Sequence, residues 1–445
     1  MLPWALIGVL VGLAYTVSPL TVLFALLLPL LHWWAVRGLD TWERRWAFGL
    51  LAIATLLRVA SIAALLLTTG PAQQLNAYFP DAKFAIERSW WIRNIWLDLP
   101  VGPLYEYFLY NPYGAASYSY ILAVIQMFVG PSPYGLNFVS TAAFLAGTIA
   151  LFRIARQSFG RPAALVALAW LLFWPSTFAW SVSMLKESMQ FALMAFLLAF
   201  TLRAVRSRTW RARLGGAIVV AAIAYALLTL RSAAVYVGLA GAGAGVVAWI
   251  LTRRPWIAVT SVVACVALGA AALSRPALQE QAMEVVRVSA GRQIGHVASN
   301  GYFYKVLDQR FYSYGTGAVR TLEPAEAVRF LGRAVMAFFT VPAPWQIASR
   351  AGLVYLPQQL AWYALLLLGI PGVVAGFRRD PLVTWLLVAT VAAGVVVIAP
   401  NSGNIGTLVR HRDMVAPALA LLSAAGFASV VGFLVRPNLT SKSEI

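Results

Sequence analysis

The feature that most constrains this chain is the recurrence of apolar runs about as long as a bilayer is thick. Runs such as 46–69 and 233–252 return along the whole sequence, and a helix needs roughly 20 mostly apolar residues to cross the hydrocarbon core. Only 11% of the 445 residues are charged, against about a quarter in a soluble domain. The sequence therefore predicts an all-α polytopic membrane protein.

The strong positive charge is explained by membrane orientation rather than by a nucleic-acid partner. The formal net charge is +19, but most basic residues lie in short stretches between apolar runs, as the positive-inside rule describes. Six clusters are expected on the cytoplasmic side: Arg37/Arg44/Arg45, Arg153/Arg156/Arg161, Arg203/Arg206/Arg208/Arg211/Arg213, Arg253/Arg254, Arg378/Arg379 and Arg436/Lys442.

With these clusters inside, most apolar runs pair into simple in-and-out crossings. The predicted pairs are 162–178 with 187–205, 214–230 with 233–252, 256–273 with 355–376, and 381–399 with 413–435. The stretch 2–36 is either one tilted helix or a hairpin that turns at Ser18-Pro19. The total is about 11 to 13 crossings.

The stretch 115–152 is long enough for two helices, although the orientation demands an odd number of crossings there. A break at Gly130-Pro131-Ser132-Pro133 indicates that one part is re-entrant, interfacial or very short. Two long segments remain outside. Segment 71–114 is rich in aromatic residues and is expected to form helices along the membrane surface, and segment 274–353 is expected to form helices at 276–288 and 325–340.

Motifs of common soluble enzymes are absent, which argues against ATP-driven transport and zinc hydrolysis of the usual kinds. The sequence has no Walker A, GxGxxG, HExxH or GxSxG motif, and its single cysteine, Cys265, forms no internal disulfide. The best leads are ionisable residues in or beside spanning segments, because a charge in hydrocarbon costs at least about 2.5 kcal/mol.

Two acidic positions near the predicted outer side are candidates. Asp81 lies about a dozen residues beyond the outer end of 46–69, where a carboxylate acts as a general base or metal ligand; the alternative is a solvated acid paired with Lys83. Lys186-Glu187 lies at the outer mouth of 187–205, and the alternative for Glu187 is simple stabilisation of a helix N-terminus.

Basic residues near the same side are the second group of candidates. Arg410-His411-Arg412 has the residue types of a phosphate clamp, because guanidinium groups bind phosphate oxygens in pairs; the alternative is headgroup anchoring by snorkelling side chains. Arg58 and Arg231 also need polar partners. Either one snorkels, pairs with a helix carbonyl, or contacts substrate.

Taken together, this layout resembles the GT-C superfamily of polyprenyl-phosphate-sugar-dependent membrane glycosyltransferases, which includes protein O-mannosyltransferases and lipid A aminoarabinose transferases. The resemblance rests on the order of several features. These are Arg58 in the first in-to-out helix, Asp81 in the outer loop, the Tyr110-Asn111-Pro112-Tyr113 helix start, Arg153-Ile154-Ala155-Arg156, the Pro175-Ser176 break, and Arg410-His411-Arg412 followed by Pro417.

The resemblance implies a polyprenyl-phosphate-linked sugar donor, a glycan or lipid acceptor, and transfer at the outer face of a bacterial cytoplasmic membrane. Asp81 then acts on the acceptor or a metal, with Glu187 as a loosely matched second acid. The residues implied to bind substrate are Arg410, His411, Arg412, Arg58, Lys186 and Arg231. Because Ala82 follows Asp81 where the family often has a second acid, the need for a divalent metal ion stays open.

Two other functions remain as alternatives to sugar transfer. A polysaccharide polymerase or O-antigen ligase-like enzyme uses a polyprenyl-pyrophosphate oligosaccharide, and the basic and aromatic residues of 274–353 suit that larger donor. A transporter of lipid-linked glycans is disfavoured, because the sequence has few mid-helix charges and no visible inverted repeat with paired broken helices.

Overall fold

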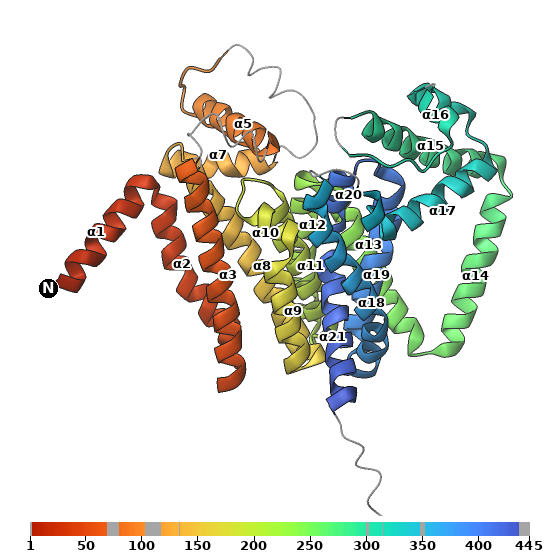
Figure 1. Cartoon of the computed structure of the whole chain (residues 1–445). Coiled ribbons are helices and arrows are strands. Elements are labelled where there is room, and N and C mark those ends of the chain that lie inside the picture. Colours follow the sequence, from red (N-terminus) through yellow and green to blue (C-terminus); the bar gives the residue numbers. More distant parts are fainter. Residues whose placement is uncertain are drawn as a thin grey trace, which may run out of the picture. The chain divides into compact units, whose positions relative to one another are not determined.

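A computed structural model gives the architecture of residues 2–68, 80–102, 117–132, 134–299, 302–313, 315–347 and 352–435 (Figure 1). Within these residues the chain is helical, and the single β-type pairing is an isolated antiparallel bridge between Phe303 and Asn404. The predicted all-α fold is confirmed. The Tyr110–Tyr113 stretch and the cluster of Arg436 and Lys442 lie outside the described residues.

The chain forms two compact units, Met1–Val235 and Tyr236–Ile445, which are described separately. The first unit contains α1 (Leu2–Val17), α2 (Pro19–Val36), α3 (Thr41–Thr68), α5 (Pro80–Trp96), α7 (Ser117–Val129), α8 (Gly135–Phe159), α9 (Arg161–Phe173), α10 (Pro175–Ser181), α11 (Glu187–Arg206) and α12 (Trp210–Leu230). The boundary between the units falls inside α13 (Ser232–Thr252).

The second unit continues from α13 with helices of two kinds, long apolar ones and more polar ones between them. Its elements are α14 (Pro255–Leu273), α15 (Pro276–Ala298), α16 (Gln309–Ser313), η1 (Thr316–Thr321), α17 (Pro324–Thr340), η2 (Pro344–Gln346), η3 (Gly352–Tyr355), α18 (Leu356–Arg379), α19 (Pro381–Ile398), η4 (Ala399–Asn401), α20 (Ile405–Arg412) and α21 (Ala416–Val435).

Eight helices of the described residues are long and apolar enough to cross a membrane, or up to eleven if each of three bent helix pairs forms one span. The chain is thus a multi-pass membrane protein. The upper number meets the lower end of the predicted 11 to 13 crossings. The bends occur between α9 and α10, between α14 and α15, and between α20 and α21.

The N-terminal stretch contains two helices, as the hairpin alternative predicted. The break lies at Ser18, whose hydroxyl accepts a hydrogen bond from the Leu20 N–H across 3.1 Å and so begins α2. Pro19 follows at the first helical position, where a missing N–H costs nothing. This turn packs against the start of α8, because a Cβ added at Gly135 would lie 2.0 Å from the Ser18 hydroxyl oxygen.

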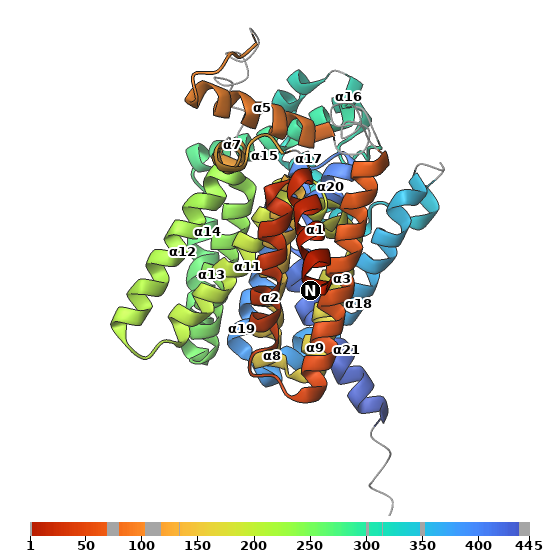
Figure 2. The same cartoon turned by 90° about the vertical axis from the view of Figure 1, so that its left-hand side faces the viewer.

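The uncertain stretch 115–152 resolves into one short helix and one spanning helix. With 13 residues, α7 is about 20 Å long, too short for a hydrocarbon core of about 30 Å. It lies across the direction of α8 and is seen nearly end-on in Figure 2. Gly130 ends α7 with a φ of 76°, which glycine adopts readily. The single crossing that the orientation requires is therefore α8.

The central helix of the first unit is α8, which is buried along most of its length and packs against α2, α9 and α11. Its contact with α11 is close at Gly147, where an added Cβ would lie 2.8 Å from the Ala192 Cα. Small residues allow such approaches between membrane helices, where packing rather than the hydrophobic effect drives association. This helix holds the unit together.

In the second unit, α18 and α21 pack through glycines on both helices. A Cβ added at Gly372 would lie 1.9 Å from the Leu422 carbonyl oxygen, and one added at Gly426 would lie 2.0 Å from the Leu368 carbonyl oxygen. Ser423 also donates a hydrogen bond to the Leu365 carbonyl across 2.6 Å. The two helices therefore touch along their backbones.

The structure extends one of the helices expected in segment 274–353 and matches the other. The predicted helix 276–288 continues to Ala298 as α15, since no proline or turn sequence follows Val288. The predicted amphipathic helix 325–340 is α17. In segment 71–114 the described part contains α5, which lies across the end of the first unit where α7 lies (Figures 1 and 2).

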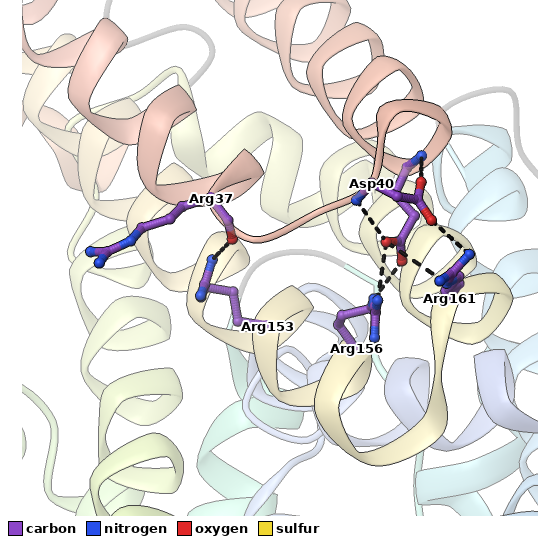
Figure 3. Close-up of polar contacts among 6 residues, drawn as sticks. Arg37, Asp40, Arg153, Arg156 and Arg161 are labelled. Atoms are coloured by element: carbon purple, nitrogen blue, oxygen red, sulfur yellow. Dashed lines mark hydrogen bonds and ion pairs between the residues drawn. The ribbon is translucent and has the colours of Figure 1, made fainter.

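Two of the basic clusters expected in the cytoplasm meet at the other end of the first unit (Figure 3). Arg156 forms an ion pair with the buried Glu43, and Arg161 Nη1 lies 2.6 Å from Asp40 Oδ2. Arg153 Nη1 donates to the carbonyls of Trp34 and Arg37, across 2.7 and 3.1 Å. The α2–α3 turn is thereby bound to the α8–α9 turn.

Candidate functional site

Arg58 is fully buried on α3, and its guanidinium joins three helices. Its Nε donates to the Ser181 hydroxyl across 2.7 Å, and its Nη2 donates to the Leu172 carbonyl across 2.9 Å. That carbonyl lies at the bend of 59° between α9 and α10, where Pro175 interrupts regular helix bonding. Arg58 thus supplies a hydrogen-bond donor to a carbonyl at the helix bend. This is the alternative in which Arg58 pairs with a helix carbonyl.

Glu187 and Arg231 form a largely buried ion pair in the first unit. Arg231 Nη1 lies 3.3 Å from Glu187 Oε1 and also donates to Gln190 Oε1 across 3.2 Å. Their side chains are 4% and 15% exposed, so little water screens the pair. Glu187 is also the first residue of α11, where the helix dipole favours a carboxylate. The structure therefore brings together two of the predicted site residues.

Asp81 lies on the exposed side of the first turn of α5. Its neighbour Ala82 belongs to a hydrophobic core that also contains Leu185, beside Lys186. The segments that carry Asp81 and Lys186-Glu187, about a hundred residues apart in sequence, therefore share one core. Lys83, the partner expected in the alternative interpretation, lies 3.5 Å from Glu87.

The position of α5 is fixed by polar contacts to α7 as well as by this core. Gln126 is fully buried on α7 and accepts a hydrogen bond from Trp90 Nε1 across 2.5 Å. The Gln126 side-chain amide nitrogen donates to the Ser89 hydroxyl across 2.7 Å, and Arg93 Nε donates to the main-chain carbonyl of Gln126 across 2.9 Å. Because α5 is held at several points, Asp81 belongs to an ordered surface element.

Asn137, on the first turn of α8, is a candidate that the sequence reasoning missed. Its side chain is fully buried, and neither the amide nitrogen nor the amide oxygen has a hydrogen-bond partner within the described part of the chain. A buried amide without partners is costly, and a ligand is one way to satisfy it. The signal available in the sequence was an asparagine within an apolar helix, which is uncharged and so does not stand out as an ionisable residue would.

In the second unit, Arg412 is buried and binds the C-terminal end of α17. Its Nε donates to the Phe338 carbonyl across 2.8 Å, and its Nη2 donates to the Ala337 carbonyl across 3.2 Å. Its Nη1 donates to Gln359 across 3.1 Å. The Nε and both terminal nitrogens of Arg412 therefore have hydrogen-bond partners within the protein.

Residues of α18 complete the cap of α17. Trp362 Nε1 donates to the Phe339 carbonyl across 3.1 Å, and the Tyr363 hydroxyl donates to the Thr340 carbonyl across 2.6 Å. The last carbonyls of a helix have no partner within the helix, so α17 depends on Arg412 and α18 for its end. Because Arg412 belongs to α20, the same contacts fix α20, the helix that also carries Arg410.

Arg410 and His411 lie on α20 and are partly exposed. The helix begins at Asn404, whose side chain accepts a hydrogen bond from the Thr407 N–H across 3.3 Å. His411 Nδ1 lies 3.4 Å from the Ser402 hydroxyl. A guanidinium and an imidazole on one short helix provide hydrogen-bond donors for an anion, in contrast to the enclosed Arg412.

The tyrosine-rich sequence of segment 274–353 lies directly against the start of α20. Tyr304 N–H donates to the Gly403 carbonyl across 2.9 Å, and Ile405 N–H donates to the Tyr302 carbonyl across 2.8 Å. The Tyr304 hydroxyl is buried without a hydrogen-bond partner in the described residues. Tyr304 is therefore a second candidate that the sequence reasoning did not single out.

A metal site receives no support from side-chain grouping. Across the described ranges, no three His, Cys, Asp or Glu side chains are grouped so that they would hold a metal ion. Asp81 is followed by Ala82, so the chain lacks a neighbouring carboxylate at that point.

Comparison with known proteins connects the middle of the chain to a described family. Residues 115–276 match the family model for dolichyl-phosphate-mannose-protein mannosyltransferase. This confirms the resemblance to the GT-C superfamily of membrane glycosyltransferases predicted from the sequence. The matched residues contain Asn137, Glu187 and Arg231. No curated protein matches the sequence.

Two solved structures are similar to this chain at low identity. ArnT from Cupriavidus metallidurans bound to undecaprenyl phosphate shares 18% identity, with 86% of this chain and 60% of that chain covered and a TM-score of 0.44. The apo state shares 17% identity, with 84% and 78% covered and a TM-score of 0.32. The chain therefore spans about 60% of the ArnT chain with bound lipid.

Proposed function

We propose that this GT-C-like protein transfers a sugar from a polyprenyl-phosphate-linked donor to an acceptor at the outer face of a bacterial cytoplasmic membrane. The observation that carries the proposal is the match of residues 115–276 to a family whose description names a dolichyl-phosphate-linked mannose donor. The undecaprenyl phosphate bound by ArnT has the same chemistry, a phosphate on a polyprenyl chain.

The orientation is supported by where the basic clusters lie. The cluster of Arg153, Arg156 and Arg161 meets Arg37 at one end of the first unit, and α5 with Asp81 lies at the other end (Figures 1 and 3). Basic residues of short loops favour the cytoplasmic side. Asp81 therefore faces the outer side in this proposal.

In the proposed reaction, Asp81 accepts the proton of an acceptor hydroxyl as the new bond to the anomeric carbon forms. The bond from that carbon to the phosphate oxygen breaks at the same time, and polyprenyl phosphate leaves with the electron pair. Cationic donors lower the barrier by stabilising the charge on the leaving group. The resemblance to GT-C enzymes assigns this role to Arg410 and His411. Within the first unit, Glu187 with Arg231 organises the helix ends near α5.

The proposal is tested by measuring sugar transfer from a synthetic polyprenyl-phosphate monosaccharide to a membrane glycan fraction, with purified full-length protein. We expect Asp81→Asn to lower kcat by a factor of about 100 or more, because loss of a general base costs roughly 10² to 10⁴ in rate. The matched control is Glu87→Gln on the same helix, which removes a partly exposed pairing with Lys83 and should leave transfer near wild type.

The alternatives give different results in the same assay. Activity that requires a pyrophosphate-linked oligosaccharide and ignores every monosaccharide donor would instead support a polymerase or ligase. Wild-type transfer by the Asp81→Asn protein would remove Asp81 from the reaction. Movement of a lipid-linked glycan across proteoliposomes without any transfer would support a transporter.

A further inference from the structure

The first unit contains a cavity of about 410 Å³ at the end opposite α5. Its walls come from the C-terminal parts of α2, α8 and α11, where two of the basic clusters lie. The lining residues are Trp34, Ala150, Arg153, Ile154, Gln157, Phe196, Ala199, Phe200, Leu202, Arg203 and Arg206. None of the proposed catalytic or substrate-binding residues is among them.

The charged residues that line this cavity are all arginines. Arg153, Arg203 and Arg206 line it, and none of its lining residues is acidic. Arg203 and Arg206 are exposed and lie three positions apart on α11, so they share one helix face. Three guanidinium groups around one space, with no carboxylate in the wall, favour an anion as occupant.

Apart from the three arginines and Gln157, the residues that line the cavity are apolar. Trp34 stacks on Phe196 with ring centroids 6.4 Å apart and planes inclined by 19°. Arg153 Nη1 donates to the Trp34 carbonyl across 2.7 Å, so one of the three arginines also fixes the aromatic wall. Because Phe200 and Leu202 extend this surface, the cavity offers an apolar face beside a cationic one.

We propose that this cavity binds an anionic phospholipid of the cytoplasmic leaflet, with the headgroup phosphate on Arg203 and Arg206 and an acyl chain against Trp34 and Phe196. A phosphate on an apolar chain matches both faces of the cavity, whereas a free phosphate uses only the cationic one. The position supports this source, because the basic ends of spans lie at the level of lipid headgroups.

The test is native mass spectrometry of the purified full chain titrated with phosphatidylglycerol or with zwitterionic phosphatidylcholine. We expect tighter retention of one phosphatidylglycerol, and a loss of roughly fivefold in affinity for each arginine removed in Arg203→Gln/Arg206→Gln. The matched control is Arg208→Gln/Arg211→Gln, which removes the same charge from the same cluster outside the cavity and should retain wild-type binding.

A second measurement locates the bound lipid. Gln157→Cys, in a Cys265→Ala background, places one thiol at the cavity wall, and its alkylation in proteoliposomes should be several times slower with phosphatidylglycerol than with phosphatidylcholine. Equal affinity for both lipids, an equal loss in the control variant, or displacement of lipid by equimolar inorganic phosphate would each overturn the proposal. This inference does not depend on the proposed sugar transfer.

Discussion

Arg231 donates from Nη1 to Oε1 of Glu187 across 3.3 Å and thereby joins the end of α12 to the first turn of α11. The two residues are 44 positions apart. From the sequence, Arg231 was expected to need a polar partner, and Glu187 was a candidate acid of the site. Their pairing explains how two charged groups are accommodated at the edge of apolar helices. It also means that changing one residue leaves the other charge buried.

Arg231→Ala should therefore destabilise the protein by about 3 kcal/mol, because the buried Glu187 carboxylate loses its ion pair with Arg231. The double variant Glu187→Gln/Arg231→Gln removes both charges and should recover most of that loss. Thermal unfolding of the three proteins in detergent checks this. If the double variant unfolds earlier than Arg231→Ala, the pair contributes more than charge compensation.

Replacing Arg412 should reduce stability, whereas replacing Arg410 should reduce sugar transfer. Arg412→Ala removes donors from the end of α17 and should lower stability by about 3 kcal/mol, because hydrogen bonds from charged groups contribute about 1.5 to 3 kcal/mol each. Arg410→Ala should leave the unfolding temperature near wild type and lower kcat for transfer from the lipid-phosphate donor, because its proposed role is to stabilise the leaving phosphate. Unfolding and transfer measured on both proteins decide between these expectations, and reversed defects would contradict the assignment.

Asn137→Leu tests whether the buried amide without protein partners serves a ligand. Replacing an unsatisfied buried polar group with an apolar side chain of similar size should raise stability by about 1 kcal/mol. If the amide binds substrate, sugar transfer should nevertheless fall at least tenfold. A stabilised protein with unchanged transfer would show that Asn137 has no part in the site.

Glu326, at the start of α17, should make this helix sensitive to acid. The Glu323 N–H donates to its carboxylate across 3.1 Å, and Arg310 pairs with it; these contacts hold the pKa of Glu326 below its usual range. A carboxyl whose pKa is lowered by folding contributes stability above its unfolded pKa of about 4.3, and that stability is lost as pH falls through the folded value.

Hydrogen exchange of α17 between about pH 6 and pH 3 measures this effect, after correction for the intrinsic exchange rate. Protection should decrease toward the acid end in wild type. Glu326→Gln cannot ionise and should show lower protection at pH 6 and a flatter dependence. An equal slope in both proteins would place the sensitive group elsewhere, with Asp308 the next candidate because Arg333 also lowers its pKa.

The sequence by itself determined the multi-pass helical class, most helix positions and the shared location of two basic clusters. Apolar length and loop charge carry this information locally, because bilayer thickness and the positive-inside rule act on each segment without knowledge of its neighbours. The helices predicted at 187–205 and 381–399 are α11 and α19, within two residues at each end.

Only the tertiary structure decided what the charged residues contact. In sequence, Arg58, Arg231 and Arg412 are alike as arginines in or beside apolar helices. In the structure, Arg58 donates to a carbonyl at a helix bend, Arg231 pairs with Glu187 and Arg412 caps α17. Their partners lie 114, 44 and 74 positions away. Hydrogen bonds depend on separations of about 3 Å, and packing of distant helices sets such separations, whereas local residue patterns do not.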